Sequence, residues 1–252
     1  MEVRWTHLKA AELRELAVKD ALVILPVAAM EQHGPHLPVN VDTLLCTEVA
    51  ERAARKLEGP VVVAPTVWCG LSEHHMALGG TFTLSFDTFF SLLADLCRSL
   101  VRHGFRRMVL LNGHGGNRAA LRVVVDELSQ ELDATIVTTT YWEAAAEEYR
   151  AILERQDGVQ HACEAETSMV MALAPEMVDR ERLAEARADV PAAVAEVMAA
   201  GLHRWRSFAE RTPSGAIGDP TAASAEKGER LLDAAAAALA GLLARADLWR
   251  PL

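Results

Sequence analysis

The chain is short of cysteine and has no hydrophobic run long enough to cross a membrane. Its four cysteines, at positions 46, 69, 97 and 163 of 252 residues, form no Cys-x-x-Cys pair. Scattered cysteines of this kind are typical of reduced, mostly buried thiols in a cytosolic protein. The longest apolar run, Ala21–Met30, is about half the length of a membrane span. No apolar signal core is visible near the N-terminus, so we expect a cytoplasmic protein.

Positive charge is also in short supply. The 25 lysine and arginine residues are outnumbered by 35 aspartate and glutamate residues, which gives a formal net charge of -10. Binding to a phosphate backbone or to an anionic membrane surface depends on clustered positive charge. We therefore expect neither nucleic acid nor a membrane among the partners.

Continuous apolar, β-branched runs alternate along the chain with helical patterns. Such runs are typical of strands that are covered on both faces, as in parallel sheets. The alternation predicts a three-layer α/β/α fold with a mainly parallel sheet and right-handed crossovers. Because no repeat or linker-like segment interrupts it, we expect residues 1–252 to form a single domain. The expected strands are 22–27, 61–65, 107–111 and 135–140, and the expected helices lie near 43–57, 87–103, 118–132 and 143–155.

Local signals refine the helical part of this prediction. Asp87 is a candidate N-cap and Gly104 a candidate C-terminal stop for the second of these helices. Beyond the last expected strand, the alanine-rich stretches 183–209 and 223–246 predict helices that serve packing or subunit contacts.

A dense polar motif, 31–38, follows the first expected strand. Its glycine and prolines exclude a helix, so a turn can aim Glu31 and His33 inward, together with the nearby Asp42. Mixed oxygen and nitrogen ligands of this kind suit zinc, manganese or iron. The alternative is a polar loop whose side chains satisfy one another.

The turns after the next two strands are also polar. His114 lies among three glycines in the segment 112–117, which lets the backbone turn sharply and approach a ligand. His74 and His75 follow the second strand, and adjacent side chains diverge, so we expect His75 to line the substrate or support other residues. The alternative for both turns is that their histidines are ordinary surface residues. Phosphate binding by the glycine-rich turn is not favoured, because its glycine spacing matches no phosphate-binding fingerprint.

Two groups follow the fourth expected strand. Trp142 is a candidate pocket wall, although an aromatic residue here is often plain core. His161, Glu164 and Glu166 offer a base and two carboxylates suited to proton transfer or metal binding. The alternative is that the acidic residues complement a helix dipole. Because parallel strands end at one edge of the sheet, these groups are expected to converge there, and they include six of the nine histidines.

Taken together and in this order, the motifs resemble those of the creatininase (creatinine amidohydrolase) family. The resemblance implies a creatininase-like fold and two divalent metal ions per subunit. It also implies hydrolysis of C–N bonds in cyclic or linear amides and a homo-oligomer, by resemblance a hexamer. The matching segments are 31–38 with Asp42, 70–72 with His75 and Gly80–Thr81, 112–117, 166–168, 218–220 and 226–228.

Carried over onto this chain, the resemblance assigns most of the metal ligands. Glu31 and His114 would bind one ion, His33 would bind the other, and Asp42 would bridge them. Creatininases proper take a further ligand from a glutamate two residues after the histidine that corresponds to His114.

That position is Gly116 in this chain, which has no side chain to offer. This chain instead has a carboxylate at Glu164, a position that by the resemblance is apolar in creatininases proper. We therefore expect Glu164 to replace the missing ligand from across the site.

The resemblance also implies roles in catalysis and substrate binding. His161 and Glu166 match the family's proton-shuttling histidine and its nearby carboxylate. Trp142 matches a tryptophan near the substrate, while a second such tryptophan is absent near Asp157, which argues against creatinine itself. The residues expected to contact substrate are His75, Gly80, Thr81 and Trp142.

The predicted function is hydrolysis of a small-molecule amide by metal-activated water, with zinc, manganese or iron as the ions. A metallopeptidase or a deformylase of the same family, acting in a cofactor pathway, is an alternative. A non-catalytic metal-binding protein is the other, and His161 and Glu166 argue against it because a metal holder needs neither.

Overall fold

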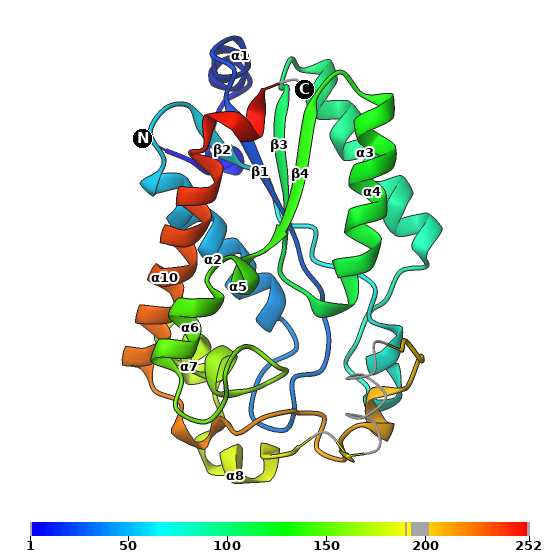
Figure 1. Ribbon diagram of the computed structural model, residues 1–252, viewed down its shortest axis with the longest axis vertical. Coiled ribbons are helices and arrows are strands. Elements are labelled where there is room, and N and C mark those ends of the chain that lie inside the picture. The colour runs from blue at the N-terminus through cyan, green and yellow to red at the C-terminus, as the bar shows by residue number, and fades with distance from the viewer. Residues whose placement is uncertain (1, 190, 193–201, 251–252) are drawn as a thin grey trace.

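A four-stranded parallel sheet forms the centre of the computed structural model, which describes residues 2–189, 191–192 and 202–250 (Figure 1). The strand order is β2-β1-β3-β4, and every neighbouring pair is parallel. The predicted α/β class with a parallel sheet is confirmed, and two of the four strands have the predicted bounds. The strands are β1 (Leu22–Val27), β2 (Val61–Val63), β3 (Arg107–Asn112) and β4 (Thr135–Thr140).

Helices cover both faces of this sheet (Figure 1). The helices α2 (Val41–Lys56) and α10 (Ala225–Leu243) lie on one side, where α7 (Glu164–Leu173) packs against both of them. The helices α3 (Phe86–Arg102) and α4 (Arg118–Glu131) lie on the other side. These helices agree with the predicted crossovers to within two residues at most ends.

The strands send alternate side chains into two separate cores. Leu22 and Ile24 of β1 lie in the core on the α2 side, whereas Val23 and Leu25 lie in the core on the α3 side. All four are at most 5% exposed. This two-sided burial explains why the strand sequences are continuously apolar rather than alternating.

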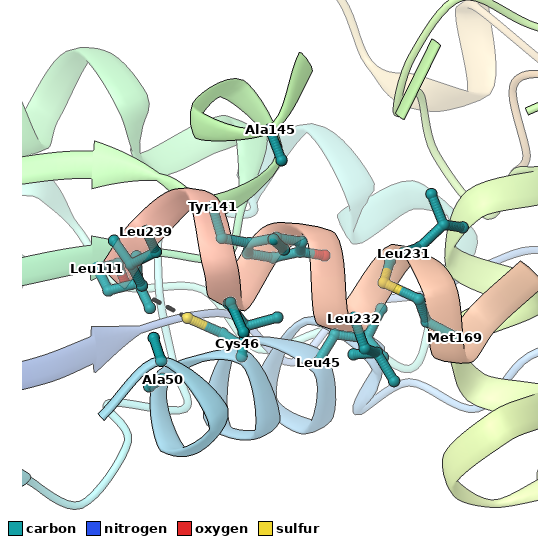
Figure 2. Packing of buried hydrophobic residues seen from close by; sticks show 14 of the residues in the cluster. Leu45, Cys46, Ala50, Leu111, Tyr141, Ala145, Met169, Leu231, Leu232 and Leu239 are labelled. Atoms are coloured by element: carbon teal, nitrogen blue, oxygen red, sulfur yellow. Dashed lines mark hydrogen bonds between the residues drawn. The ribbon is translucent and has the colours of Figure 1, made fainter. Parts of the chain in front are cut away.

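Figure 2 shows part of the α2-side core, where α2 and α10 meet the sheet. The Sγ atom of Cys46 on α2 donates a hydrogen bond to the backbone oxygen of Leu111 on β3, at 3.3 Å. Tyr141 packs between the same layers and is 1% exposed. The four cysteines are all free thiols, as the sequence predicted.

Some local predictions need correction. Ser85, rather than Asp87, caps α3, because its side chain accepts a hydrogen bond from the Thr88 N–H. Gly104 follows the last turn of α3 with φ 96°, so the predicted glycine stop is confirmed. Helix α1 (Ala10–Val18) was not predicted from the sequence.

The predicted helix 143–155 is two short helices, which Ala145 separates with φ -116° and ψ 27°. They are α5 (Tyr141–Ala144) and α6 (Ala146–Ile152).

The alanine-rich stretches behave differently from each other. The stretch 223–246 forms α10, as predicted. In the stretch 183–209, α8 (Leu183–Ala186) is α-helical, whereas 187–189 and 202–207 have no helix, so the helix prediction is wrong for those described residues. The prediction for 193–201 lies outside the described residues.

No helix in the described ranges is both long enough and apolar enough to span a bilayer.

Short 3₁₀ helices connect these elements. The 3₁₀ helices are η1 (Trp5–His7), η2 (Glu73–Leu78), η3 (Gly115–Asn117), η4 (Pro175–Met177), η5 (Arg180–Arg182), η6 (Phe208–Glu210), η7 (Pro220–Ala222) and η8 (Ala246–Trp249).

Candidate metal centre

The carboxyl ends of β1 and β3 deliver the first part of the site. Beyond β1, the Glu31 N–H donates to the Val39 oxygen at 2.9 Å, which closes the polar motif into a loop. Asp42 lies in the first turn of α2, directly after this loop. Beyond β3, the His114 N–H donates to Oδ1 of Asn112 at 3.1 Å. The two strand ends therefore present their acidic and imidazole groups to the same space.

Asp42 lies between two histidines in this space. Its Oδ2 atom is 2.9 Å from Nδ1 of His114, and its Oδ1 atom is 3.2 Å from Nε2 of His33. Nδ1 of His114 is also 3.2 Å from Oε2 of Glu31. All four residues are at most 4% exposed. One carboxylate thus faces two imidazoles, one oxygen to each.

Backbone carbonyl groups set the tautomer of both histidines. Nδ1 of His33 donates to the Glu31 oxygen at 3.1 Å, which leaves Nε2 facing Asp42. Nε2 of His114 lies 3.1 Å from the Leu71 oxygen and donates to it, which leaves Nδ1 facing the carboxylates. Metal-bound histidines are commonly held in this way by their other ring nitrogen.

Several atoms of this cluster lack a hydrogen-bond partner among the described residues. They are Oε2 of Glu31, Nε2 of His33 and Oδ2 of Asp42, whose approaches of 2.9–3.2 Å to one another and to His114 lack hydrogen-bond geometry. Burying such atoms unpaired is costly, so native proteins normally satisfy them. Ligand atoms of these three residues lie within 4.8 Å of one another, so a divalent cation could satisfy all of them. The residues present therefore fit a metal ion.

The electrostatics of the cluster also favour a cation. Burial lowers the pKa of His33, but the carboxylates of Asp42 and Glu166 outweigh burial and raise this pKa to about 9. Burial raises the pKa of Asp42, but His33 and His114 outweigh it and hold this pKa well below its usual range. The carboxylates thus hold positive charge on His33, and a metal ion could take the place of that proton.

Glu166 reaches the same space from the first turn of α7. Its Oε1 atom is 3.9 Å from Nε2 of His33, and its Oε2 atom accepts a hydrogen bond from the Ala162 N–H at 2.5 Å. Burial raises the pKa of Glu166 to about 7, against the opposing charge of His33. Ligand atoms of His33, His161 and Glu166 form a second group within 4.8 Å.

His75 supports Glu31 through a neutral imidazole. Nε2 of Gln32 lies 2.7 Å from Nδ1 of His75, and an amide nitrogen can only donate. Nε2 of His75 therefore carries the proton and donates to Oε1 of Glu31, at 3.3 Å. Burial, as the largest cause, lowers the pKa of His75, which agrees with this neutral state. The predicted supporting role of His75 fits this geometry, and Gln32 was missed.

His161 has its own tautomer set by the main chain. Its Nε2 atom donates to the Gln32 backbone oxygen at 2.9 Å, so Nδ1 is left as an acceptor 3.6 Å from Oε1 of Glu31. Burial, then the charge of His33, lowers the pKa of His161 well below its usual value. The side chain is thus a neutral base beside the metal ligands.

A family model described as creatininase, creatinine amidohydrolase, matches residues 6–243. The chain belongs to the creatininase family. Curated members of similar sequence include the creatinine amidohydrolase of Pseudomonas putida, which is 31% identical and covers 92% of this chain and 90% of its own length. The mycofactocin precursor peptide peptidase of Mycobacterium ulcerans is 33% identical over 83% of this chain and 79% of its own length. This is a family of metal-dependent hydrolases that cleave C–N bonds.

Solved creatininases share the fold over the whole chain. The structure named creatininase Mn superposes with a TM-score of 0.80 and 28% identity, covering 100% of both chains. A mutant creatininase of Zn-Zn type superposes with a TM-score of 0.78 and 27% identity, again over 100% of both chains. Structures of the family thus hold manganese or zinc.

Glu164 lies away from the metal-ligand cluster of this creatininase-family protein. Its carboxylate accepts hydrogen bonds from the N–H groups of Glu154 and Arg155 and from Nζ of Lys227 at 2.7 Å. Residues two apart on a helix point about 200° apart, so Glu164 faces away from the space that Glu166 faces. The prediction that Glu164 replaces the family's missing ligand does not agree with this position, and we remove it from the ligand set.

Gly116, where creatininases carry their further ligand, is closely packed. A Cβ atom at this position would collide with the Leu71 oxygen, with Nε2 of His114 and with the ring of His74. The His74 ring is stacked on His114, with 5.7 Å between centroids and 19° between planes. His74 therefore fills the space beside the family's usual ligand position, and its ring forms a group with Glu31 and His114.

Phe208 covers the imidazoles and was not found from the sequence. Its ring stacks on His75 at 4.2 Å and meets His161 edge-on at 4.7 Å. It is 4% exposed and belongs to η6, far along the chain from both histidines. It occurs in the stretch that the sequence predicted as a packing helix, and no local signal marks it.

The other predicted substrate contacts have structural partners. Oγ1 of Thr81 accepts a hydrogen bond from the Gln32 N–H at 3.1 Å, and Gly80 turns beside it with φ 62°. Trp142 is half-buried, lies edge-on to Tyr141 at 4.9 Å, and packs against the α2-side core. Thr81 thus fixes the polar motif, and contact of Trp142 with substrate stays a prediction.

Proposed function

We propose that this chain is a two-metal amidohydrolase. The observation that carries the proposal is the buried carboxylate of Asp42 between His33 and His114, among ligand atoms that lack hydrogen-bond partners. A neutral His161 lies beside this cluster with one ring nitrogen free to exchange a proton. A protein that only holds metal has no use for such a base.

The ligands divide between two ions. Glu31, Asp42 and His114 would hold the first ion, because Nδ1 of His114 lies 3.2 Å from Glu31 and 2.9 Å from Asp42. His33, Asp42 and Glu166 would hold the second, so that Asp42 bridges. Glu166, which the resemblance paired with His161 as a proton-transfer carboxylate, would here supply the carboxylate that the resemblance places at the position of Gly116.

Zinc, manganese or iron bound here would lower the pKa of a water molecule and polarise the amide carbonyl group. The chain's own residues would transfer the proton, hold the ligands in place and exclude water. His161 uses Nδ1 to accept a proton and to pass it to the leaving nitrogen, because its Nε2–H is held by the Gln32 oxygen. His75 keeps Glu31 in place, and the Phe208 ring shields both histidines from water.

A small cyclic or linear amide is the first candidate substrate. A peptide amide is the second, since several relatives of about 31–33% identity bear the name mycofactocin precursor peptide peptidase. Both substrates need the same hydrolytic groups.

The test separates metal binding from turnover. Purified protein is analysed for metal and assayed against amides, formamides and short peptides. Glu31→Ala should lose metal and activity together. His161→Gln should keep its metal and lose about 10²- to 10⁴-fold in kcat, the usual contribution of a general acid–base. His103→Gln, at an exposed position on the far end of α3, is the control.

Two outcomes would contradict the proposal. Loss of metal in His161→Gln would make His161 a ligand rather than a base. Stoichiometric metal in the wild-type protein without hydrolysis of any amide would favour a metal-holding protein.

A further inference from the structure

Arg211 places its guanidinium group next to Phe208, the ring that covers His75 and His161. It has no carboxylate partner among the described residues. It follows η6, and its Cζ atom lies 5.7 Å from the centroid of the Phe208 ring. Its Nε atom is buried and has no hydrogen-bond partner in the ranges that the structure describes. The rest of the side chain is half-buried, and a buried N–H donor normally has a partner, so one is expected at Nε when the protein works.

Two contacts place this guanidinium beside the catalytic groups. The Phe208 ring that it approaches is itself stacked on His75 and edge-on to His161. The guanidinium therefore lies on the ring that covers His75 and His161.

No carboxylate of the described residues forms an ion pair with Arg211. The nearest acidic neighbour along the chain, Glu210, approaches Arg206 at 4.0 Å and accepts a hydrogen bond from the Ser207 N–H at 2.9 Å. Burial, and then the like charge of Arg206, lowers the pKa of Arg211. Two arginines thus lie close together at the edge of the site, and the carboxylate beside them is paired with Arg206.

We propose that Arg211 binds a free carboxylate of the substrate. The substrate is then an amide that carries a carboxylate a short distance from its scissile bond, such as an N-acyl amino acid or a short peptide. This inference rests on the proposed amidohydrolase function and adds the substrate class to it. A planar guanidinium matches a carboxylate through two parallel hydrogen bonds. A chain of net charge -10 repels anions in general, so an anionic substrate needs a local cation of this kind.

The test compares matched pairs of substrates. Each pair is an N-acyl amino acid or short peptide with a free carboxylate and the same compound as its carboxamide. The wild-type enzyme should have a KM roughly 10- to 100-fold lower for the acid, the range for a hydrogen-bonded charge. Arg211→Gln should raise the KM for the acid until this preference is lost, with metal content unchanged and a smaller effect on kcat. Arg211→Lys should restore part of the preference.

Arg204→Gln, at an exposed position of the same segment, is the matched control and should keep the preference. Retention of the acid preference in Arg211→Gln would overturn the proposal, as would equal KM values for acid and carboxamide in the wild type.

Calorimetric binding of the same pairs separates this inference from the proposed hydrolysis. If no amide is hydrolysed but the acid still binds more tightly and Arg211→Gln removes that difference, the amidohydrolase proposal fails and the carboxylate site stands. Tighter binding of inorganic phosphate than of any carboxylate would overturn the inference in favour of a phosphorylated substrate.

Discussion

Two glutamates on α7 show how much depends on a single residue's direction. Glu164 is 0% exposed and binds Lys227, whereas Glu166 faces His33 across 3.9 Å. They are two positions apart, have the same side chain and occur in the same motif. Their different partners follow from where α7 begins, at Cys163 as N-cap, since this start sets which face each residue occupies.

The first prediction uses these glutamates as a matched pair. Glu166→Gln should lose about one of two metal ions per chain, because the second ion would lose its carboxylate. Glu164→Gln should keep both ions but lower the free energy of unfolding by about 1–3 kcal/mol, because Lys227 loses a charged partner. Elemental analysis and urea unfolding measure the two effects. Equal metal loss in both variants would show that the assignment of ligands is wrong.

The sequence predicted well which residues come together at the edge of the sheet. It predicted poorly which residues of α7 face that site. Glu31, His33, Asp42 and His114 come together because turns follow two parallel strands at one edge of the sheet. Glu164 was placed incorrectly, because a motif does not reveal where a helix starts. Phe208 could not be predicted, because its contacts with distant histidines depend on tertiary packing alone.

At the scale of elements, His36 joins the polar motif to α7. Its Nε2 atom lies 2.8 Å from Oγ1 of Thr167, and its backbone oxygen accepts a hydrogen bond from the Asp179 N–H. Burial, then the charge of His33, lowers the pKa of His36 to about 4. Protonation of this buried ring is therefore disfavoured, and the folded chain keeps it neutral near pH 7.

This link predicts a pH dependence of stability. The unfolded chain binds a proton at His36 below pH about 6.5, whereas the folded chain binds it only near pH 4. The contribution is thus complete above pH about 6.5 and is lost as the pH falls towards about 4. It amounts to up to about 3 kcal/mol, from a difference of roughly 2.5 pKa units. Free energies of unfolding in urea between pH of about 7.5 and about 5 should fall less steeply in His36→Gln than in the wild type.

The His103→Gln variant, changed at an exposed position, should follow the wild-type slope, since it retains His36 and all the buried histidines. Identical slopes in His36→Gln and the wild type would contradict this role for His36.

Strands and crossover helices were predicted about equally well. The run that forms β1 is apolar and the run that forms β4 is β-branched, neither has a competing pattern, and their bounds were correct. Helix propensity is a weak guide to 202–207, because tertiary contacts override it. These residues have no helix, and Phe208, directly after them, lies over His75.

At the scale of the whole molecule, the site gathers charged groups that are expensive to bury without a metal. Glu31, Asp42 and Glu166 place three carboxylates within one buried space, among several imidazoles. A bound cation would offset their repulsion, because it would bind the folded chain and not the unfolded one. On the proposed ligand set, metal binding and folding would be coupled.

Chelation tests this coupling. With metal at about 100 times its Kd, binding stabilises the fold by about 2.7 kcal/mol. Removal of the metal should then lower Tm by about 5–10 °C in a chain of this size. Differential scanning calorimetry with and without a chelator measures the shift, and Glu31→Ala is the control that should show little change. A wild-type Tm that is indifferent to the chelator would argue against a structural contribution from metal.

The close packing at Gly116 has a consequence for how the ligands of this family can change during evolution. A glutamate there would collide with the Leu71 oxygen and with the ring of His74. It therefore cannot be introduced by one substitution while the loop that holds Leu71 and His74 keeps its place. The loop and the turn must change together, and a sequence that altered only one of them would lose either its packing or a ligand. On the proposed ligand set, a carboxylate at position 116 and the carboxylate of Glu166 are therefore alternative ways of completing the second ion site, and a change from one to the other needs more than one substitution.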